Sequence, residues 1–169
     1  MDQDFLARWT DREAIRGDAR RVLAAVVQRF VADGGPVEVA SLVAERAELP
    51  SGAGEADAHV VRQAVAELDQ SDLLLVEAER IVLAYPFASA PTAFLALLDD
   101  GRQRYACCSI DALGIAALLR RHVHVRSRCH HCGEPIELRV SPEGPLDGGD
   151  VMTWVGRRED LRAKACASL

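Results

Sequence analysis

The sequence lacks any long apolar run and is poor in aromatic residues. Only 5% of its residues are aromatic, and no stretch approaches the roughly 18 apolar residues that a membrane span requires. The first residues, "MDQDFLARWTDREAIRGD", are charged throughout and lack the apolar segment of a signal peptide. These absences argue against membrane association and secretion, so we expect a cytoplasmic protein. Its composition, 49% hydrophobic and 27% charged, is typical of a soluble globular protein.

The first half of the chain has the pattern of three helices and a β-hairpin. Apolar residues recur at helical spacing over 11–33, 37–49 and 55–69, and 73–85 reads as two strands around a turn at Ala78 and Glu79. This is the order of elements in a winged helix-turn-helix, a frequent DNA-binding module.

Lysine is absent from the first 80 residues, and this charge balance argues against DNA binding. The segment holds nine arginines against sixteen acidic residues. Arg62 is the single formal positive charge on the third helix, the one that would enter a DNA groove. Affinity for phosphates depends on lysine and arginine contacts, so we interpret this part as a helical cap for the C-terminal half of the chain.

The second half predicts a small sheet with helices beside it. Residues 92–99, 122–128, 135–141 and 151–156 have strand character, 107–121 predicts a helix, and the last residues form a helical or extended tail. We therefore predict an α+β fold, with a winged-helix-like helical region over 1–85 and a small mixed β-sheet with flanking helices over 86–169.

The five cysteines lie in the C-terminal two-fifths of the chain. An odd number of cysteines in a reducing compartment argues against a disulfide framework and favours metal binding or thiol chemistry. The residues are Cys107, Cys108, Cys129, Cys132 and Cys166.

Cys108 and Asp111 stand three positions apart at the start of the predicted helix. Side chains at this spacing share one helix face, with Cβ atoms about 5–6 Å apart. The free N–H groups of a first helical turn tend to lower the pKa of a thiol. The pair therefore suits soft-metal binding or nucleophile activation. The structural alternative is a buried small cysteine followed by an exposed aspartate.

Several motifs in order resemble the alkylmercury lyase (organomercurial lyase) family. They are "YPFASAPT", "YACCSIDALG" and "LLRRHVHVRSRCHHCGEPIELRVSPEG", which together with the tail cover roughly residues 85–166. This family also carries a winged-helix-like region ahead of its catalytic part. The matching residues are Tyr105, Ala106, Cys108, Asp111, Leu113, Ser127, Cys129, Gly133, Pro135 and Ile136.

The resemblance implies protonolysis of a carbon–mercury bond, which turns R–Hg⁺ into a hydrocarbon and Hg²⁺. Cys108 and Cys166 would bind mercury, and Asp111 would deliver the proton to the carbon. No organic cofactor is required, and free thiols or a mercuric reductase would accept the Hg²⁺. Cys107 is an extra ligand or, more in keeping with free cysteines in general, a spare buried thiol. Family members continue beyond the second cysteine, whereas this chain ends three residues after Cys166, which implies a site that is less enclosed or completed by a partner chain.

The stretch "RCHHCGEP" has the shape of a zinc-knuckle turn. Cys129 and Cys132 supply two ligands, whereas structural zinc usually takes four, and the chain has no second Cys-x-x-Cys. Zinc at Cys129 and Cys132 and a structural turn with reduced thiols both stay open.

Two other functions stay open beside the lyase. One is a non-catalytic, cysteine-based metal-binding or metal-sensing protein built on a winged helix. The other is a relative of the lyases that performs different chemistry. A pure thiolate sensor has no need of Asp111, and this favours the lyase.

Overall fold

The computed structural model describes residue 15 and residues 17–47 and 54–153. The chain divides into two compact units, Met1–Ala84 and Tyr85–Leu169. None of the helices in the described ranges combines the length and apolar character that a membrane crossing demands.

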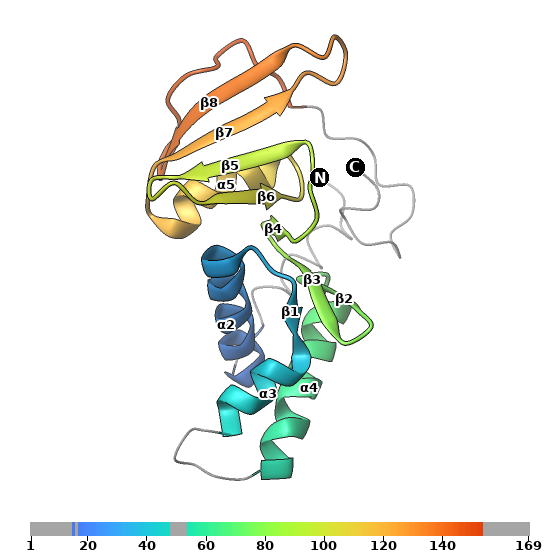
Figure 1. The fold of residues 1–169 in the computed structure, drawn as a ribbon. Helices are drawn as coiled ribbons and strands as arrows, with labels where there is room; N and C mark the ends of the chain where they lie inside the picture. The colour runs from blue at the N-terminus through green and yellow to red at the C-terminus, as the bar shows by residue number, and fades with distance from the viewer. Residues whose placement is uncertain (1–14, 16, 48–53, 154–169) are drawn as a thin grey trace. The chain divides into compact units, whose positions relative to one another are not determined.

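The first unit consists of three helices and a small antiparallel sheet (Figure 1). Its elements in chain order are α2 (Gly17–Asp33), β1 (Val37–Glu38), α3 (Val39–Ala47), α4 (Gly54–Gln70), β2 (Leu74–Glu77) and β3 (Arg80–Ala84). Both β1 and β2 pair with β3, so β3 is the middle strand. The predicted hairpin is present: Ala78 and Glu79 turn the chain in the left-handed region, at φ of 48° and 65°.

The core of the first unit follows the helical periodicity of the sequence. Helices α2 and α3 both pack against α4. Phe30 and Val26 of α2, Leu68 of α4 and Leu74 of β2 are fully buried. Burial of each such side chain contributes about 1.5–3 kcal/mol, so these faces hold the three helices on the sheet.

The second unit is an antiparallel sheet with one described helix. The strands are β4 (Phe87–Ala88), β5 (Phe94–Leu98), β6 (Gln103–Ala106), β7 (Val123–Arg128), β8 (Pro135–Ser141) and β9 (Gly144–Pro145), and the helix is α5 (Ser109–Leu119). The spatial order of the strands is β4-β6-β5-β7-β8-β9. Helix α5 contacts β5 through β9 and lies across one face of this sheet, behind β5 and β6 in Figure 1.

The α+β class is confirmed, and several finer predictions need correction. The sheet of the second unit is antiparallel in every pairing described within it, not mixed. The sequence did not predict β4, β6 or β9, because two-residue strands and a strand next to a turn give little periodicity. Residues 151–153 form no strand, and the rest of the strand predicted over 151–156 lies outside the described residues.

Candidate active site

Cys107 and Cys108 lie where β6 ends and α5 begins. The backbone N–H of Cys107 donates to the Pro86 carbonyl at 3.1 Å. The hydroxyl of Thr92 donates to the Ala106 carbonyl at 2.6 Å, and the Phe94 N–H donates to the same hydroxyl at 3.2 Å. These bonds tie the chain just before the cysteines to its two neighbouring segments. Sequence analysis did not single out Thr92, whose hydroxyl makes two of these bonds.

Cys108 is the N-cap of α5. Its backbone is extended, at φ −145° and ψ −179°, and its Sγ accepts a hydrogen bond from the Asp111 N–H at 3.4 Å. Its carbonyl accepts from the Ala112 N–H at 2.9 Å and so begins the helix. A helix leaves its first N–H groups without partners inside the helix. The sulfur therefore does here what a serine or aspartate oxygen does at most helix starts.

The structure brings Cys108 and Asp111 together. The Cys108 Sγ lies 3.1 Å from the Asp111 Oδ2, in hydrogen-bond geometry with the thiol as donor. Both side chains are half-buried. A thiol proton is thus already shared with the carboxylate that could receive it.

The expectation of a lowered thiol pKa at Cys108 is wrong. Burial of the sulfur, helped by the Asp111 carboxylate, raises the pKa of Cys108 to about 11, although the N–H groups of Asp111 and Ile110 act in the opposite direction. A thiolate facing a carboxylate would place two negative charges side by side. In the absence of a cation, Cys108 is therefore a neutral thiol that donates to Asp111.

Of the other thiols at this end of the chain, Cys107 is half-buried beside Cys108. Cys166, the predicted second mercury ligand, lies outside the described residues.

The helix that carries the pair is apolar on all sides. We expected Leu113, Ala116, Ala117 and Leu118 on its buried side. Of these four, Ala116 is buried, together with Ala112 and Ile115, whereas Leu118 and also Ile110 are about half exposed, at 50% and 56%. Because this helix is not amphipathic, its sequence does not indicate which face packs on the sheet.

Cys129 and Cys132 lie in the turn between β7 and β8. The Cys129 N–H donates to the Glu134 carbonyl at 2.8 Å, and the Gly133 N–H donates to the Cys129 carbonyl at 2.9 Å. Hydrogen bonds from the backbone N–H groups of Cys132 and His131, and from the Cys132 thiol, lower the pKa of Cys129. The two predicted zinc ligands are therefore neighbours in space.

The described residues form no closed metal site around this turn. Within the described ranges, no group of three or more histidine, cysteine, aspartate or glutamate side chains could hold a metal ion. The Nε2 of His124 lies 3.4 Å from the Glu137 carboxylate, and His130 and His131 are exposed. The four-ligand zinc site considered from the sequence is thus not formed by described residues.

A shallow hollow of about 400 Å³ lies beside the same hairpin. Thr92, Arg126, Arg128, Ile136 and Glu137 are among the residues that line it. The lining combines apolar surface with the charged side chains of Arg126, Arg128 and Glu137, and Cys108 and Asp111 are not part of it.

The fold and the thiols of the second unit are suited to binding a soft metal cation. An antiparallel α+β unit that carries a paired thiol and carboxylate at a helix start, and further free thiols, has the ligand types that soft cations prefer.

Comparison with known proteins identifies the family. Residues 87–168 match the alkylmercury lyase family model. The chain is 30% identical over 115 residues to an alkylmercury lyase of Staphylococcus epidermidis, covering 68% of this chain and 48% of the relative. It is 50% identical over 44 residues to one of Bacillus cereus, covering 26% of this chain and 20% of the relative. The C-terminal part of the chain, residues 87–168, belongs to the alkylmercury lyase family.

A solved structure extends the likeness to most of the chain. The crystal structure of the mercury-bound form of MerB2 superimposes with a TM-score of 0.65 at 25% identity, covering 83% of this chain and 64% of that chain. The matches cover half or less of the length of the Staphylococcus epidermidis and Bacillus cereus proteins.

Proposed function

We propose that this protein cleaves the carbon–mercury bond of organomercurial cations by protonolysis. The observation that carries the proposal is the hydrogen bond of 3.1 Å from the Cys108 thiol to the Asp111 carboxylate. It joins a soft-metal ligand and a proton acceptor on one helical turn. Membership of the alkylmercury lyase family supplies the reaction class.

In the first step of the proposed reaction, the Cys108 sulfur binds mercury and its proton passes to Asp111. The raised pKa of Cys108 keeps the proton on the sulfur until a cation arrives. Binding of mercury then favours the thiolate, because a soft cation bonds to the deprotonated sulfur. The Asp111 Oδ2 already accepts the hydrogen bond of this thiol, so it is the natural acceptor for the proton.

In the second step, Asp111 returns the proton to the carbon bound to mercury. A second thiolate, which we propose is Cys166 after loss of its thiol proton to solvent, bonds to mercury and raises the electron density on that carbon, and the Hg–C electron pair takes the proton held by Asp111. The hydrocarbon R–H leaves, and Hg²⁺ stays on the two sulfurs. The net reaction converts R–Hg⁺ and one proton into R–H and Hg²⁺, with no change of oxidation state and no organic cofactor.

We further propose which thiols accept the Hg²⁺ product and in which compartment the protein acts. Hg²⁺ leaves two thiolates only when other thiols take it, so free thiols or a mercuric reductase in a reducing cytoplasm complete the cycle.

We also propose that the N-terminal unit is winged-helix-like. The order α2-β1-α3-α4-β2-β3, with β1 and β2 on either side of β3, supports this interpretation. The acidic surplus of the first 80 residues argues that the unit serves as a cap and not as a DNA reader.

The test is detection of benzene or methane in the headspace over phenylmercury or methylmercury, with excess small thiol present. We expect hydrocarbon from the wild type, none from Asp111→Asn or Cys166→Ser, and near wild-type amounts from the matched neighbour Cys107→Ser. Mercury bound by the wild type in stoichiometric amount without hydrocarbon would refute the lyase and favour a thiol metal-binding protein.

A further inference from the structure

The turn that joins β7 to β8 is held rigidly at both ends. The ladder between the two strands continues to the pair Arg128 and Pro135. Beyond it, the Cys129 N–H reaches the Glu134 carbonyl at 2.8 Å, and the Arg128 Nη1 donates to the Gly133 carbonyl at 3.1 Å. Gly133, at φ +74°, supplies the left-handed backbone that lets the chain turn back into β8. The connection is therefore fixed by hydrogen bonds that do not involve the sulfurs.

Both sulfurs are brought to one place by this turn. The Gly133 N–H bond to the Cys129 carbonyl, at 2.9 Å, curls the chain into a single helical turn. Residues three apart in such a turn lie on one face. The N–H groups of Cys132 and His131 and the Cys132 thiol favour the Cys129 thiolate and lower its pKa. Two thiols thus form a preorganised pair, which reduces the ordering cost of binding a ligand.

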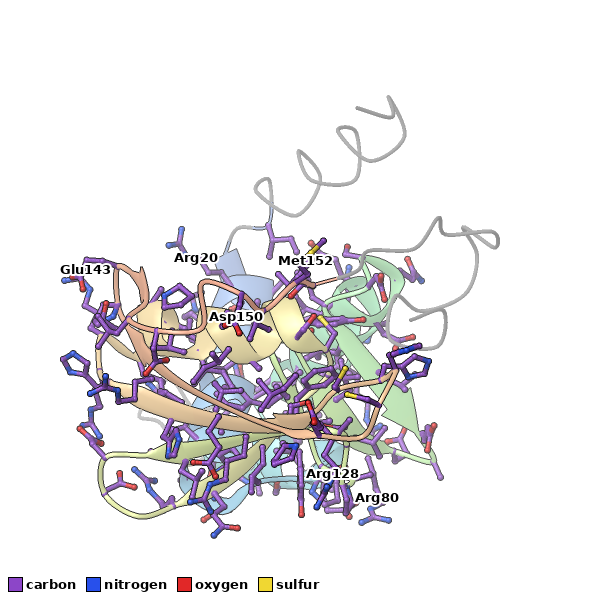
Figure 2. The ribbon with its side chains drawn as sticks, turned by 90° about the horizontal axis from the view of Figure 1, so that it is seen from above. Arg20, Arg80, Arg128, Glu143, Asp150 and Met152 are labelled. Atoms are coloured by element: carbon purple, nitrogen blue, oxygen red, sulfur yellow. The ribbon has the colours of Figure 1, made fainter. Side chains whose placement is uncertain are left out.

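The pair is also accessible. Cys132 is exposed and Cys129 half-buried, and Arg128, the last residue of β7, which Figure 2 labels, is exposed. A ligand can therefore reach this turn directly from solvent.

We propose that Cys129 and Cys132 form a second thiol site that binds Hg²⁺ or another soft cation through both sulfurs. Thiolates select soft cations. A cation that is stable with two sulfur ligands requires no third ligand from the protein. Structural zinc takes four ligands, and the described residues gather no third one here. The turn therefore favours the softest cations over zinc.

Binding at this site is a ligand exchange without oxidation. Two S–H bonds break, their protons go to solvent, and two sulfur–metal bonds form. The site is independent of the proposed lyase reaction, because neither cysteine takes part in the pair of Cys108 and Asp111. The two proposals can therefore fail separately.

The test uses the full-length chain in which Cys107, Cys108 and Cys166 are changed to serine. Affinity is measured by titrating Hg²⁺ in competition with a small dithiol, and proton release is measured separately, by adding Hg²⁺ in weak buffer without the dithiol. We expect one equivalent of bound Hg²⁺ and two protons released. Adding Cys129→Ser or Cys132→Ser should lower affinity by about 100-fold or more, since even residues that only orient a ligand cost about 10- to 100-fold. His130→Ser, in the same turn, should leave affinity unchanged.

Three results would overturn the proposal. The first is Hg²⁺ affinity that persists when both turn cysteines are serine. The second is Zn²⁺ bound as tightly as Hg²⁺, which would point to a closed site with further ligands. The third is a mass lower by two hydrogens in the presence of reductant, which would show a stable disulfide in the turn. Far-UV circular dichroism of each variant verifies that the chain is folded.

Discussion

The Asp111 residue contacts the Cys108 sulfur twice, through two different groups. Its backbone N–H donates to Sγ at 3.4 Å, and its Oδ2 accepts from the thiol at 3.1 Å. The N–H group favours the thiolate, whereas the carboxylate favours the thiol. Burial, which is the largest cause, and the carboxylate together prevail, and the pKa of Cys108 is raised to about 11. The Asp111 carboxylate loses its negative charge, and with it its part of this effect, when it takes the proton.

Asp111→Asn should lower the pKa of Cys108. The substitution removes the negative charge that disfavours the thiolate, while burial, the largest cause, remains. The thiol should therefore titrate between about 11 and its ordinary value of 9.0. The measurement is the pH dependence of alkylation by iodoacetamide, in a chain with serine at the other four cysteines.

A matched variant for this experiment is Asp99→Asn. Asp99 pairs with Arg121 at 3.4 Å and is not among the groups that shift Cys108, so its removal should leave the alkylation profile unchanged. An unchanged profile in Asp111→Asn would mean that burial alone sets the pKa of this thiol.

Cys108 should make the protein less stable in alkaline solution. Its folded pKa, about 11, lies above the ordinary value of 9.0. Below 9.0 both states keep the proton, so the group's contribution is complete there. As pH rises from 9.0 to about 11, the unfolded chain releases this proton and the folded chain retains it, so the free energy of unfolding falls. Urea unfolding over this range should show a shallower fall in Cys108→Ser than in the wild type.

Cys107→Ser is the comparison that isolates this effect. It removes a neighbouring half-buried thiol and leaves the sulfur that contacts Asp111 in place. The same alkaline slope in wild type and Cys108→Ser would contradict the raised pKa.

The candidate pair could be predicted from the sequence, but its electrostatics could not. Side chains at positions i and i+3 of a helix are neighbours in any tertiary environment. To predict that Cys108 and Asp111 lie together, it was therefore enough to predict where the helix starts. The pKa of Cys108 depends first on burial of its sulfur, which is set by tertiary packing and not by the local sequence pattern. For the same reason the packed face of α5 was predicted only in part, at Ala116, because only tertiary contacts distinguish Ile115 from Leu118 in a helix that is apolar all round.

Gly35→Ala should destabilise the N-terminal unit more than Gly17→Ala does. Both glycines have positive φ, at 66° and 61°, so both variants carry similar backbone strain. A Cβ at Gly35 would lie 2.6 Å from Cε1 of Phe30, whereas a Cβ at Gly17 would meet nothing within 4 Å. Phe30 is fully buried, so movement of its ring would disturb the residues packed around it. Overpacking should cost Gly35→Ala about 1–3 kcal/mol beyond the Gly17→Ala loss, measured by chemical denaturation. Equal losses would show that the ring can yield.

Thr92→Val should weaken the segment that leads into the candidate site, whereas Thr92→Ser should not. Valine keeps the shape of the side chain and removes the hydroxyl that donates to the Ala106 carbonyl and accepts from the Phe94 N–H. Loss of these bonds at a half-buried position should cost about 1–3 kcal/mol of unfolding free energy. Serine retains the hydroxyl, so it should restore both bonds. Because Ala106 directly precedes the two cysteines, hydrocarbon release by Thr92→Val should also fall at a temperature where the variant is fully folded. Full activity in folded Thr92→Val would show that Thr92 stabilises the sheet without positioning Cys108.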